Sequence, residues 1–181
     1  MTKPPLYRIE ALNGDHNRTA FSCGVESLDK YFQTQVTQDI RRHITNCFVA
    51  VSTETGDVAA YYTMASASIP TPDLPPEEIK RLPRYPTMPA VRIGRLAVAM
   101  KYQNLGIGRI LIMDATAKTL SAAPASYALL VDAKDDKAED FYQKHGFCNL
   151  TGMQRVLFLP LATAQKALLL GKDFSKTNAK P

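Results

Sequence analysis

Long apolar runs and paired cysteines are both missing from this chain of 181 residues. No stretch approaches the ~18 apolar residues of a membrane span, and the opening MTKPPLYRIEALNG has no apolar run of signal-peptide length. Cys23, Cys47 and Cys148 are far apart, form no Cys-x-x-Cys, and have no histidine beside them at ligand spacing. Free, mostly buried thiols are therefore expected, rather than disulfides or a metal site. These absences predict a soluble, cytoplasmic protein without a metal and without membrane contact.

Acidic residues are missing from one long segment. Residues 79–113 contain seven basic residues and no acid, while the rest of the chain has 15 basic residues against 17 acidic ones. A concentrated positive segment on a nearly neutral body suits a polyanionic ligand or substrate. A solvated surface that happens to lack acids explains the same pattern equally well.

The periodicity of the apolar residues predicts one α/β domain over residues 1–181, with a frayed tail from about 172. Residues 70–89 hold seven of the 12 prolines and predict a connecting segment with a short helix at 76–82. The helix predicted at 108–120 should bury Ile110, Leu111 and Ala115. The other predicted elements are a helix at 25–40, a hairpin of strands 47–52 and 58–66, and strands at 90–100, 127–133 and 154–161.

The segment DDKAEDFYQKHGF predicts a short helix with both ends marked. Asp136, followed by Glu139 three residues later, resembles a capping box. Gly146 suits the position after the last turn, and the next residue can fold back onto that turn. Phe141 and Tyr142 should point to different sides of this helix, and Phe141 is the better candidate for a core position.

Two glycines one residue apart, Gly106 and Gly108, lie between a predicted strand and a predicted helix. Such a junction brings backbone N–H groups close to an anion. The lysine of a Walker A loop is absent, and a Rossmann turn fits poorly because Leu111 occupies its third glycine position. From these residues alone, a glycine-rich turn that merely starts a helix remains open.

The segment QNLGIG, residues 103–108, resembles the Gln/Arg-x-x-Gly-x-Gly/Ala motif of the GNAT acyltransferases, and FYQKHGF, residues 141–147, resembles their next motif. The likeness extends from about residue 21 to residue 160 and is closest to the GNAT toxins of type II toxin–antitoxin pairs. It includes FSCGVESLDKYF, AAYYTMASASI, LPPEEIKRLPRYPTMPAVRIGRLAV and LLVDAKDDKAEDFYQKHGF.

This resemblance implies the GNAT fold, an α/β (α+β) fold with a central mixed β-sheet flanked by helices. It also implies an enzyme that uses acetyl-CoA, and no metal, to acetylate the α-amino group of aminoacyl-tRNA and so block translation. A ribbon-helix-helix antitoxin, and through it operator DNA, would be partners, and a homodimer is expected.

The resemblance also implies a role for individual residues. Tyr142 would donate a hydrogen bond or a proton to the departing sulfur. The contacts to tRNA phosphates would come from Lys80, Arg81, Arg84 and Arg92. The acetyl-CoA contacts would come from Leu96, Ala97, Val98, Gln103, Asn104, Gly106, Ile107, Gly108, Arg109 and Phe141.

The remaining chemistry follows from the residue types. No acid stands out as a general base, which favours an α-amine, with a pKa of ~7.7–8.0, over a lysine at ~10.4. Asp132 and Asp135 could relay a proton, although structural caps or turns suit them better. The alternatives are a GNAT enzyme that acetylates a small amine or a protein N-terminus, and a non-catalytic acyl-CoA-binding module, which Tyr142 disfavours.

Overall fold

The computed structural model describes residues 6–169, and they fall into two compact units. The first contains the residues up to Ala65 together with Gly94–Asp114, and the second contains Ser66–Ile93 and the residues from Ala115 on. Seven strands are hydrogen-bonded in the order β1-β2-β3-β4-β5-β7-β6. The β4–β5 pair is parallel, and the β1–β2, β2–β3, β5–β7 and β6–β7 pairs are antiparallel, so the sheet is mixed as predicted.

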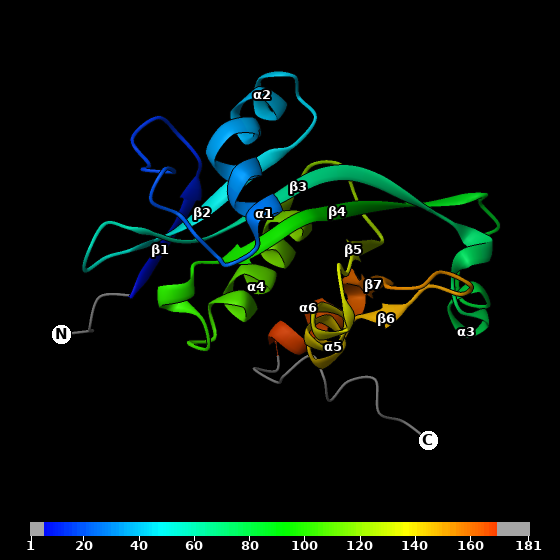
Figure 1. Cartoon of the computed structure of the whole chain (residues 1–181). Helices are drawn as coiled ribbons and strands as arrows, with labels where there is room; N and C mark the ends of the chain where they lie inside the picture. Colours follow the sequence, from blue (N-terminus) through cyan, green and yellow to red (C-terminus); the bar gives the residue numbers. More distant parts are fainter. Residues whose placement is uncertain (1–5, 170–181) are drawn as a thin grey trace. The chain divides into compact units, whose positions relative to one another are not determined.

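In the first unit, three antiparallel strands lie side by side (Figure 1): β1 (Tyr7–Ala11), β2 (Asn46–Ser52) and β3 (Val58–Pro70). The predicted hairpin of β2 and β3 is confirmed, and β3 continues to residue 70. The periodicity gave no signal for β1, because its half-exposed YRIEA pattern is short and polar.

The helix predicted at 25–40 is present as three consecutive pieces. They are α1 (Glu26–Lys30), a π-helical turn η1 (Tyr31–Gln35) and α2 (Val36–Arg41). The wider π turn brings Tyr31 as well as Phe32 into the core. Phe32 stacks on Tyr61 with ring centroids 4.2 Å apart, and Phe21 contacts both rings edge-on.

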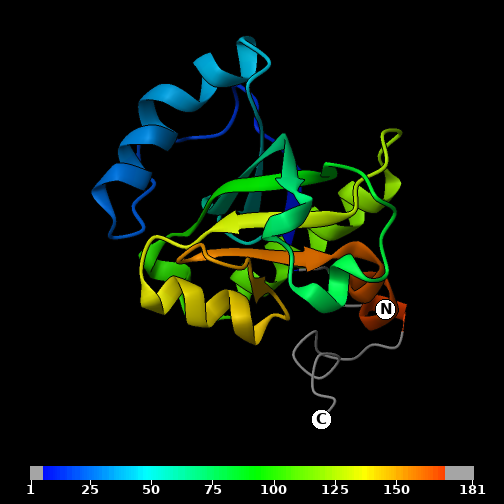
Figure 2. The ribbon, with the colours of Figure 1, turned by 90° about the vertical axis from the view of Figure 1, so that its right-hand side faces the viewer.

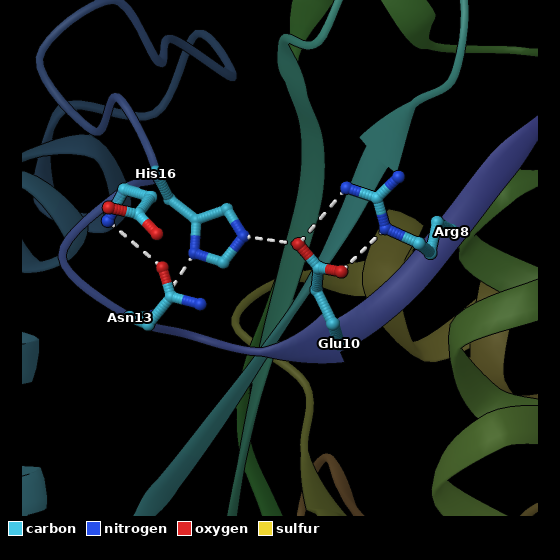
Figure 3. A network of polar contacts seen from close by, with 5 residues as sticks. Arg8, Glu10, Asn13 and His16 are labelled. Atoms are coloured by element: carbon cyan, nitrogen blue, oxygen red, sulfur yellow. Dashed lines mark hydrogen bonds and ion pairs between the residues drawn. The ribbon is translucent and has the colours of Figure 1, made fainter.

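An ion-pair network joins β1 to the loop that follows it (Figure 3). Glu10 accepts hydrogen bonds from Arg8 at 2.6 Å and from His16 Nε2 at 2.7 Å. His16 Nδ1 in turn accepts the backbone N–H of Asn13 at 3.0 Å, so the ring proton lies on Nε2. These contacts lower the pKa of Glu10 to about 2, with the hydrogen bond from Arg8 as the largest cause.

In the second unit, β5 (Ala128–Asp132) lies between β4 (Thr87–Val98) and β7 (Val156–Pro160), as Figure 2 shows. It pairs in parallel with β4 from Ala90 opposite Ala128 to Ile93 opposite Val131. Residues 128–131 are all buried, which confirms the strand predicted from the continuous apolar run at 127–133. A short strand β6 (Cys148–Asn149) pairs with β7.

The helical elements from residue 71 onward are η2 (Thr71–Asp73), α3 (Pro76–Ile79), η3 (Met100–Tyr102), α4 (Ile107–Ser121), α5 (Asp136–Lys144) and α6 (Leu161–Leu169). The short helix after the prolines is confirmed, and α6 is an addition. Leu111 and Ala115 of α4 are buried as predicted, but Ile110 is 39% exposed, so its predicted burial was wrong. The predicted frayed tail from 172 lies outside the described residues.

The two ends of α5 test the predicted helix caps. The N-cap is Asp135, whose side chain accepts the backbone N–H of Ala138 at 2.8 Å. The predicted box starting at Asp136 was therefore one residue too late. At the other end Gly146 has φ 88°, and the N–H of Phe147 donates to the carbonyl of Tyr142, which confirms the predicted reversal of the chain.

Candidate functional site

Residues 103–106 form the loop that leads into α4. Asn104 (φ 62°) and Gly106 (φ 79°) both adopt the left-handed conformation, which asparagine and glycine tolerate best. A Cβ on Gly106 would meet no other atom within 4 Å, so the backbone is openly accessible there. The first N–H groups of an α-helix have no partner within the helix. At the start of α4 these include the N–H groups of Ile107 and Gly108, which suits an anion.

The side chain of Gln103 holds this loop in place. Its Nε2 donates to the carbonyl of Cys23 at 2.9 Å and to the carbonyl of Val98 at 3.0 Å. The loop is thereby tied both to the end of β4 and to the segment before α1. The amide that the sequence singled out as a cofactor contact thus fixes the loop conformation.

A second tether precedes the loop, and sequence reasoning missed it. The carboxylate of Asp57, in the β2–β3 turn, accepts from Lys101 Nζ at 3.2 Å and from the hydroxyl of Tyr102 at 3.1 Å. The hydroxyls of Tyr102 and Thr55 are 3.0 Å apart. The hydrogen bond from Lys101 is the largest cause of a lowered pKa at Asp57. The residues in each of these contacts are more than 40 positions apart in the chain, so no local sequence pattern predicts them.

Leu96, Ala97 and Val98 form the last part of β4. The register of β4 with β5 ends at Ile93, so these three residues follow the part of the strand that pairs with β5. Ala97 is buried, whereas Leu96 and Val98 are half-buried. The guanidinium of Arg95, also in β4, lies 3.4 Å from the ring centroid of Tyr31, a contact that gives Arg95 a structural role.

Tyr142 is buried on α5, with only 8% of its surface exposed. Its ring packs edge-on against Phe141 and Phe147, with centroids 5.2 and 5.3 Å away. Its hydroxyl makes no hydrogen bond with any described residue, and no fully buried side-chain polar atom among those residues lacks a partner. The hydroxyl therefore keeps contact with solvent. Phe141 is only half-buried, so the prediction that it would fill the core better than Tyr142 was wrong.

Burial raises the pKa of Tyr142, and the negative charge of Asp132 raises it further. Tyr142 is therefore protonated at neutral pH and is a hydrogen-bond donor rather than a base. Of the two acids considered for a proton relay, Asp135 caps α5, and Asp132 forms a 2.9 Å ion pair with Arg92. The structural reading of Asp135 is confirmed.

The four basic residues predicted to contact RNA fall into two pairs. Lys80 bonds to Glu77 at 3.0 Å, and Arg92 bonds to Asp132. Arg81 and Arg84 are exposed and form no ion pair with any described residue.

A polar hollow of about 540 Å³ was not singled out by the sequence. Arg155 (φ 59°) bonds to Asp136 at its edge with N–O distances of 2.7 and 3.1 Å. The hollow is lined by Asp136, Glu139, Asn149, Gly152, Met153, Gln154 and Arg155. Among residues 6–169 no cluster of three or more His, Cys, Asp or Glu could hold a metal ion. Likewise, none of the described helices is long and apolar enough to cross a membrane.

Comparison with known proteins identifies the family. Residues 82–158 match the family model of the acetyltransferase (GNAT) domain. A tRNA-acetylating toxin of Mycobacterium tuberculosis is 33% identical over 131 residues, which are 71% of this chain and 76% of the relative. The chain therefore belongs to the GNAT acetyltransferases, in the branch that contains tRNA-acetylating toxins.

Two solved structures are similar over nearly the whole chain. The toxin AtaT complexed with acetyl-methionyl-tRNAfMet has a TM-score of 0.80 and 29% identity, covering 91% of this chain and 99% of its own. A tyrosine-to-phenylalanine mutant of AtaT, bound to the C-terminus of the antitoxin AtaR and acetyl-CoA, has a TM-score of 0.73 and 26% identity, covering 93% and 100%. The predicted fold and the predicted enzyme class, an acetyltransferase, are confirmed.

Proposed function

We propose that this protein is a toxin that transfers the acetyl group of acetyl-CoA to the α-amino group of aminoacyl-tRNA and thereby blocks translation. The likeness to the tRNA-acetylating toxin carries the proposal, because it is 33% identical over 71% of this chain. The AtaT complex with acetyl-methionyl-tRNAfMet supports the same substrate class.

The loop before α4 fits the pyrophosphate of acetyl-CoA. The open backbone at Gly106 and the first N–H groups of α4 suit a phosphate group, and the helix dipole adds ~0.3–1 kcal/mol. The residues proposed to hold it are Gln103, Asn104, Gly106, Ile107, Gly108 and Arg109, with Leu96, Ala97 and Val98 along the pantetheine arm and Phe141 as a further contact. When bound, acetyl-CoA supplies the activated acetyl thioester.

Tyr142 is proposed as the catalytic residue that stabilises the departing sulfur. A thiol has a pKa near ~8.5, and an unperturbed tyrosine one near ~10, so full proton transfer from tyrosine to the thiolate is already uphill. Burial raises the pKa of Tyr142 further and makes that transfer less favourable still. Donation of a hydrogen bond remains favourable, so Tyr142 would stabilise the thiolate while the final proton comes from the acetylated amine.

The proposed acceptor needs no strong base. An α-amine with a pKa of ~7.7–8.0 is partly unprotonated near neutrality, which agrees with the engagement of Asp135 in a helix cap and of Asp132 in an ion pair. Arg81 and Arg84 are proposed to bind tRNA phosphates directly. Lys80 and Arg92 would join them by exchanging their present carboxylate partners.

The proposed protein partner is an antitoxin with a ribbon-helix-helix domain that binds operator DNA, and the toxin is proposed to be a cytoplasmic homodimer. The AtaT structure bound to the C-terminus of AtaR supports an antitoxin of some kind. Neutralisation would then require only a short antitoxin segment on the toxin surface.

Acetylation of a charged tRNA tests the proposal. Purified protein incubated with radiolabelled acetyl-CoA and total aminoacyl-tRNA should label the RNA, and the label should leave with the amino acid on mild alkaline treatment. Expression without an antitoxin should arrest growth. Labelling of free amines or protein N-termini with no labelling of RNA would instead assign the protein to the other class of GNAT enzyme.

A further inference from the structure

One aromatic ring of the second unit is largely exposed. Tyr85, in the proline-rich segment between α3 and β4, is 62% exposed. Its side chain takes part in no hydrogen bond or ring contact with any described residue. Because this ring is exposed, it contributes little to the packing of the core. The residues around it indicate which ligand it could bind.

The backbone beneath this ring is fixed. The carbonyl of Tyr85 accepts the hydroxyl of Thr71, and its N–H donates to the carbonyl of Pro83 at 2.8 Å. The N–H of Thr71 also donates to Pro86 at 2.9 Å. Two prolines beside Tyr85 restrict the chain further, since proline fixes φ. The segment is anchored by Leu82, which packs against a buried apolar cluster, and by Met88 just after it, which belongs to that cluster. The ring is thus presented by a pre-ordered segment, which lowers the entropic cost of binding.

The charges beside Tyr85 are positive and unpaired. Arg84 is its neighbour and Arg81 lies four residues before it, and both are exposed without an ion pair among residues 6–169. Residues 79–113 contain no acid. A flat aromatic surface flanked by cations matches a nucleotide, whose base stacks while its phosphates pair with the cations.

We propose that Tyr85 is a stacking platform for an unpaired base of the RNA substrate, with Arg81 and Arg84 bound to the adjacent phosphates. This inference rests on the proposed function, because it assigns a contact to the tRNA that the enzyme acetylates. Stacking on Tyr85 tolerates any base, since every base has a π-face. Paired bases in a duplex are already stacked on one another and offer no such face.

The chain has no tryptophan, which provides a direct test. A Tyr85→Trp variant carries a single indole at the proposed platform, and tRNA should quench its fluorescence. Blunt double-stranded RNA and acetyl-CoA should leave the signal unchanged. A Leu120→Trp variant, at a position 37% exposed at the end of α4, is the matched control and should show no quenching by tRNA. Equal quenching of both variants, or quenching by blunt duplex, would overturn the inference.

The kinetics of two further variants distinguish a loss of the aromatic ring from a loss of folded protein. Tyr85→Phe keeps the ring and should acetylate charged tRNA normally. Tyr85→Ala should raise the KM for charged tRNA by roughly 5- to 150-fold, the range expected for one base–aromatic stack, with the KM for acetyl-CoA unchanged. An unchanged KM for tRNA in a folded Tyr85→Ala variant would refute the platform while leaving the proposed function intact. If the wild type acetylates no charged tRNA, the proposed function fails, and quenching of Tyr85→Trp by tRNA would still support an RNA contact at this position.

Discussion

At the scale of single residues, Tyr142 differs from the other buried tyrosines. Their hydroxyls have partners within the protein: Tyr31 bonds to Asp39, Tyr61 to Leu28, Tyr62 to Asp114 and Tyr102 to Asp57, and the half-buried Tyr127 likewise bonds to Glu78. Buried hydroxyls are normally satisfied in this way. Tyr142 packs its ring among aromatic neighbours and leaves its hydroxyl without a partner among the described residues, which supports a role toward a ligand rather than toward the fold.

Replacement of Tyr142 by phenylalanine tests that role. Because its hydroxyl bonds to no described residue, Tyr142→Phe should keep the melting temperature and the acetyl-CoA affinity of the wild type. The rate of transfer to charged tRNA should fall by ~10²–10³, as expected for the loss of one hydrogen-bond donor to the developing thiolate. Single-turnover acetylation on the preparation used for thermal melting measures both.

Tyr61→Phe is the matched control for this prediction. It also removes one hydroxyl, but that hydroxyl bonds to the carbonyl of Leu28 at 2.8 Å. Its free energy of unfolding should fall by ~1 kcal/mol, with a normal rate per folded molecule. Loss of stability together with a normal rate in Tyr142→Phe would make Tyr142 a structural residue.

The Glu10 network predicts a pH dependence of stability. The pKa of Glu10 falls from its ordinary value of 4.5 to about 2 on folding, through Arg8 and His16. A lowered pKa means that the contribution is complete above about pH 5 and is lost as the pH falls toward 2. Solvent screening limits it to ~1 kcal/mol. Urea unfolding should therefore separate Glu10→Gln from the wild type at pH 7, and the gap should narrow below pH 4.5 and close as the pH falls through about 2. A gap that does not narrow with falling pH would contradict this account.

At the scale of elements, the sequence was informative wherever apolar periodicity and chain breakers coincide. The β2–β3 hairpin, β5 and α5 were predicted because each has a regular pattern between clear boundaries. The short strands β1 and β6 were not, since pairing with neighbouring strands stabilises them rather than their own pattern. The π turn within the first helix and the position of the α5 cap depend on packing and on backbone geometry that spacing alone does not encode.

The same division holds for the candidate site. The glycines of the loop and Tyr142 belong to local motifs, so the sequence revealed them. The tethers that hold the loop do not, because Gln103 reaches back to Cys23 and Tyr102 reaches back to Asp57. The pairing of Lys80 and Arg92 with acids, which leaves Arg81 and Arg84 as the unpaired members of the basic set, also required the structure.

The loop before α4 predicts a difference between two glycines of similar geometry. Gly106 (φ 79°) and Gly152 (φ 71°) both have no atom within 4 Å of an added Cβ, so each alanine variant should lose ~1–2 kcal/mol through backbone strain alone. Gly106→Ala should also weaken acetyl-CoA binding, because its Cβ occupies the space proposed for the pyrophosphate. Gly152→Ala should bind acetyl-CoA normally. Titration calorimetry on both folded variants decides, and equal affinities would remove Gly106 from the cofactor site.

At the scale of the whole molecule, the formal net charge of +5 arises from one acid-free segment. A protein that binds RNA through a few phosphates releases counterions, so its affinity falls with salt in proportion to the number of phosphates that it neutralises. The salt dependence of the affinity therefore counts the phosphates that the protein neutralises, and this count needs no structure of the complex. The tRNA measurement needs no acetyl-CoA, whose proposed site is the loop before α4. The single-domain organisation of residues 1–181 remains a prediction.

Reversal of the two unpaired arginines should therefore change the salt dependence by a countable amount. In Arg81→Glu/Arg84→Glu, tRNA binding should weaken, and the slope of log K against log salt should become shallower by ~0.7–0.9 for each phosphate that the variant no longer neutralises. Lys80→Ala provides a comparison: because Lys80 must leave Glu77 to bind a phosphate, its slope should become shallower by no more than the share of one phosphate. Acetyl-CoA affinity should be unchanged in both. A double variant with the slope of the wild type would mean that tRNA binds through another surface.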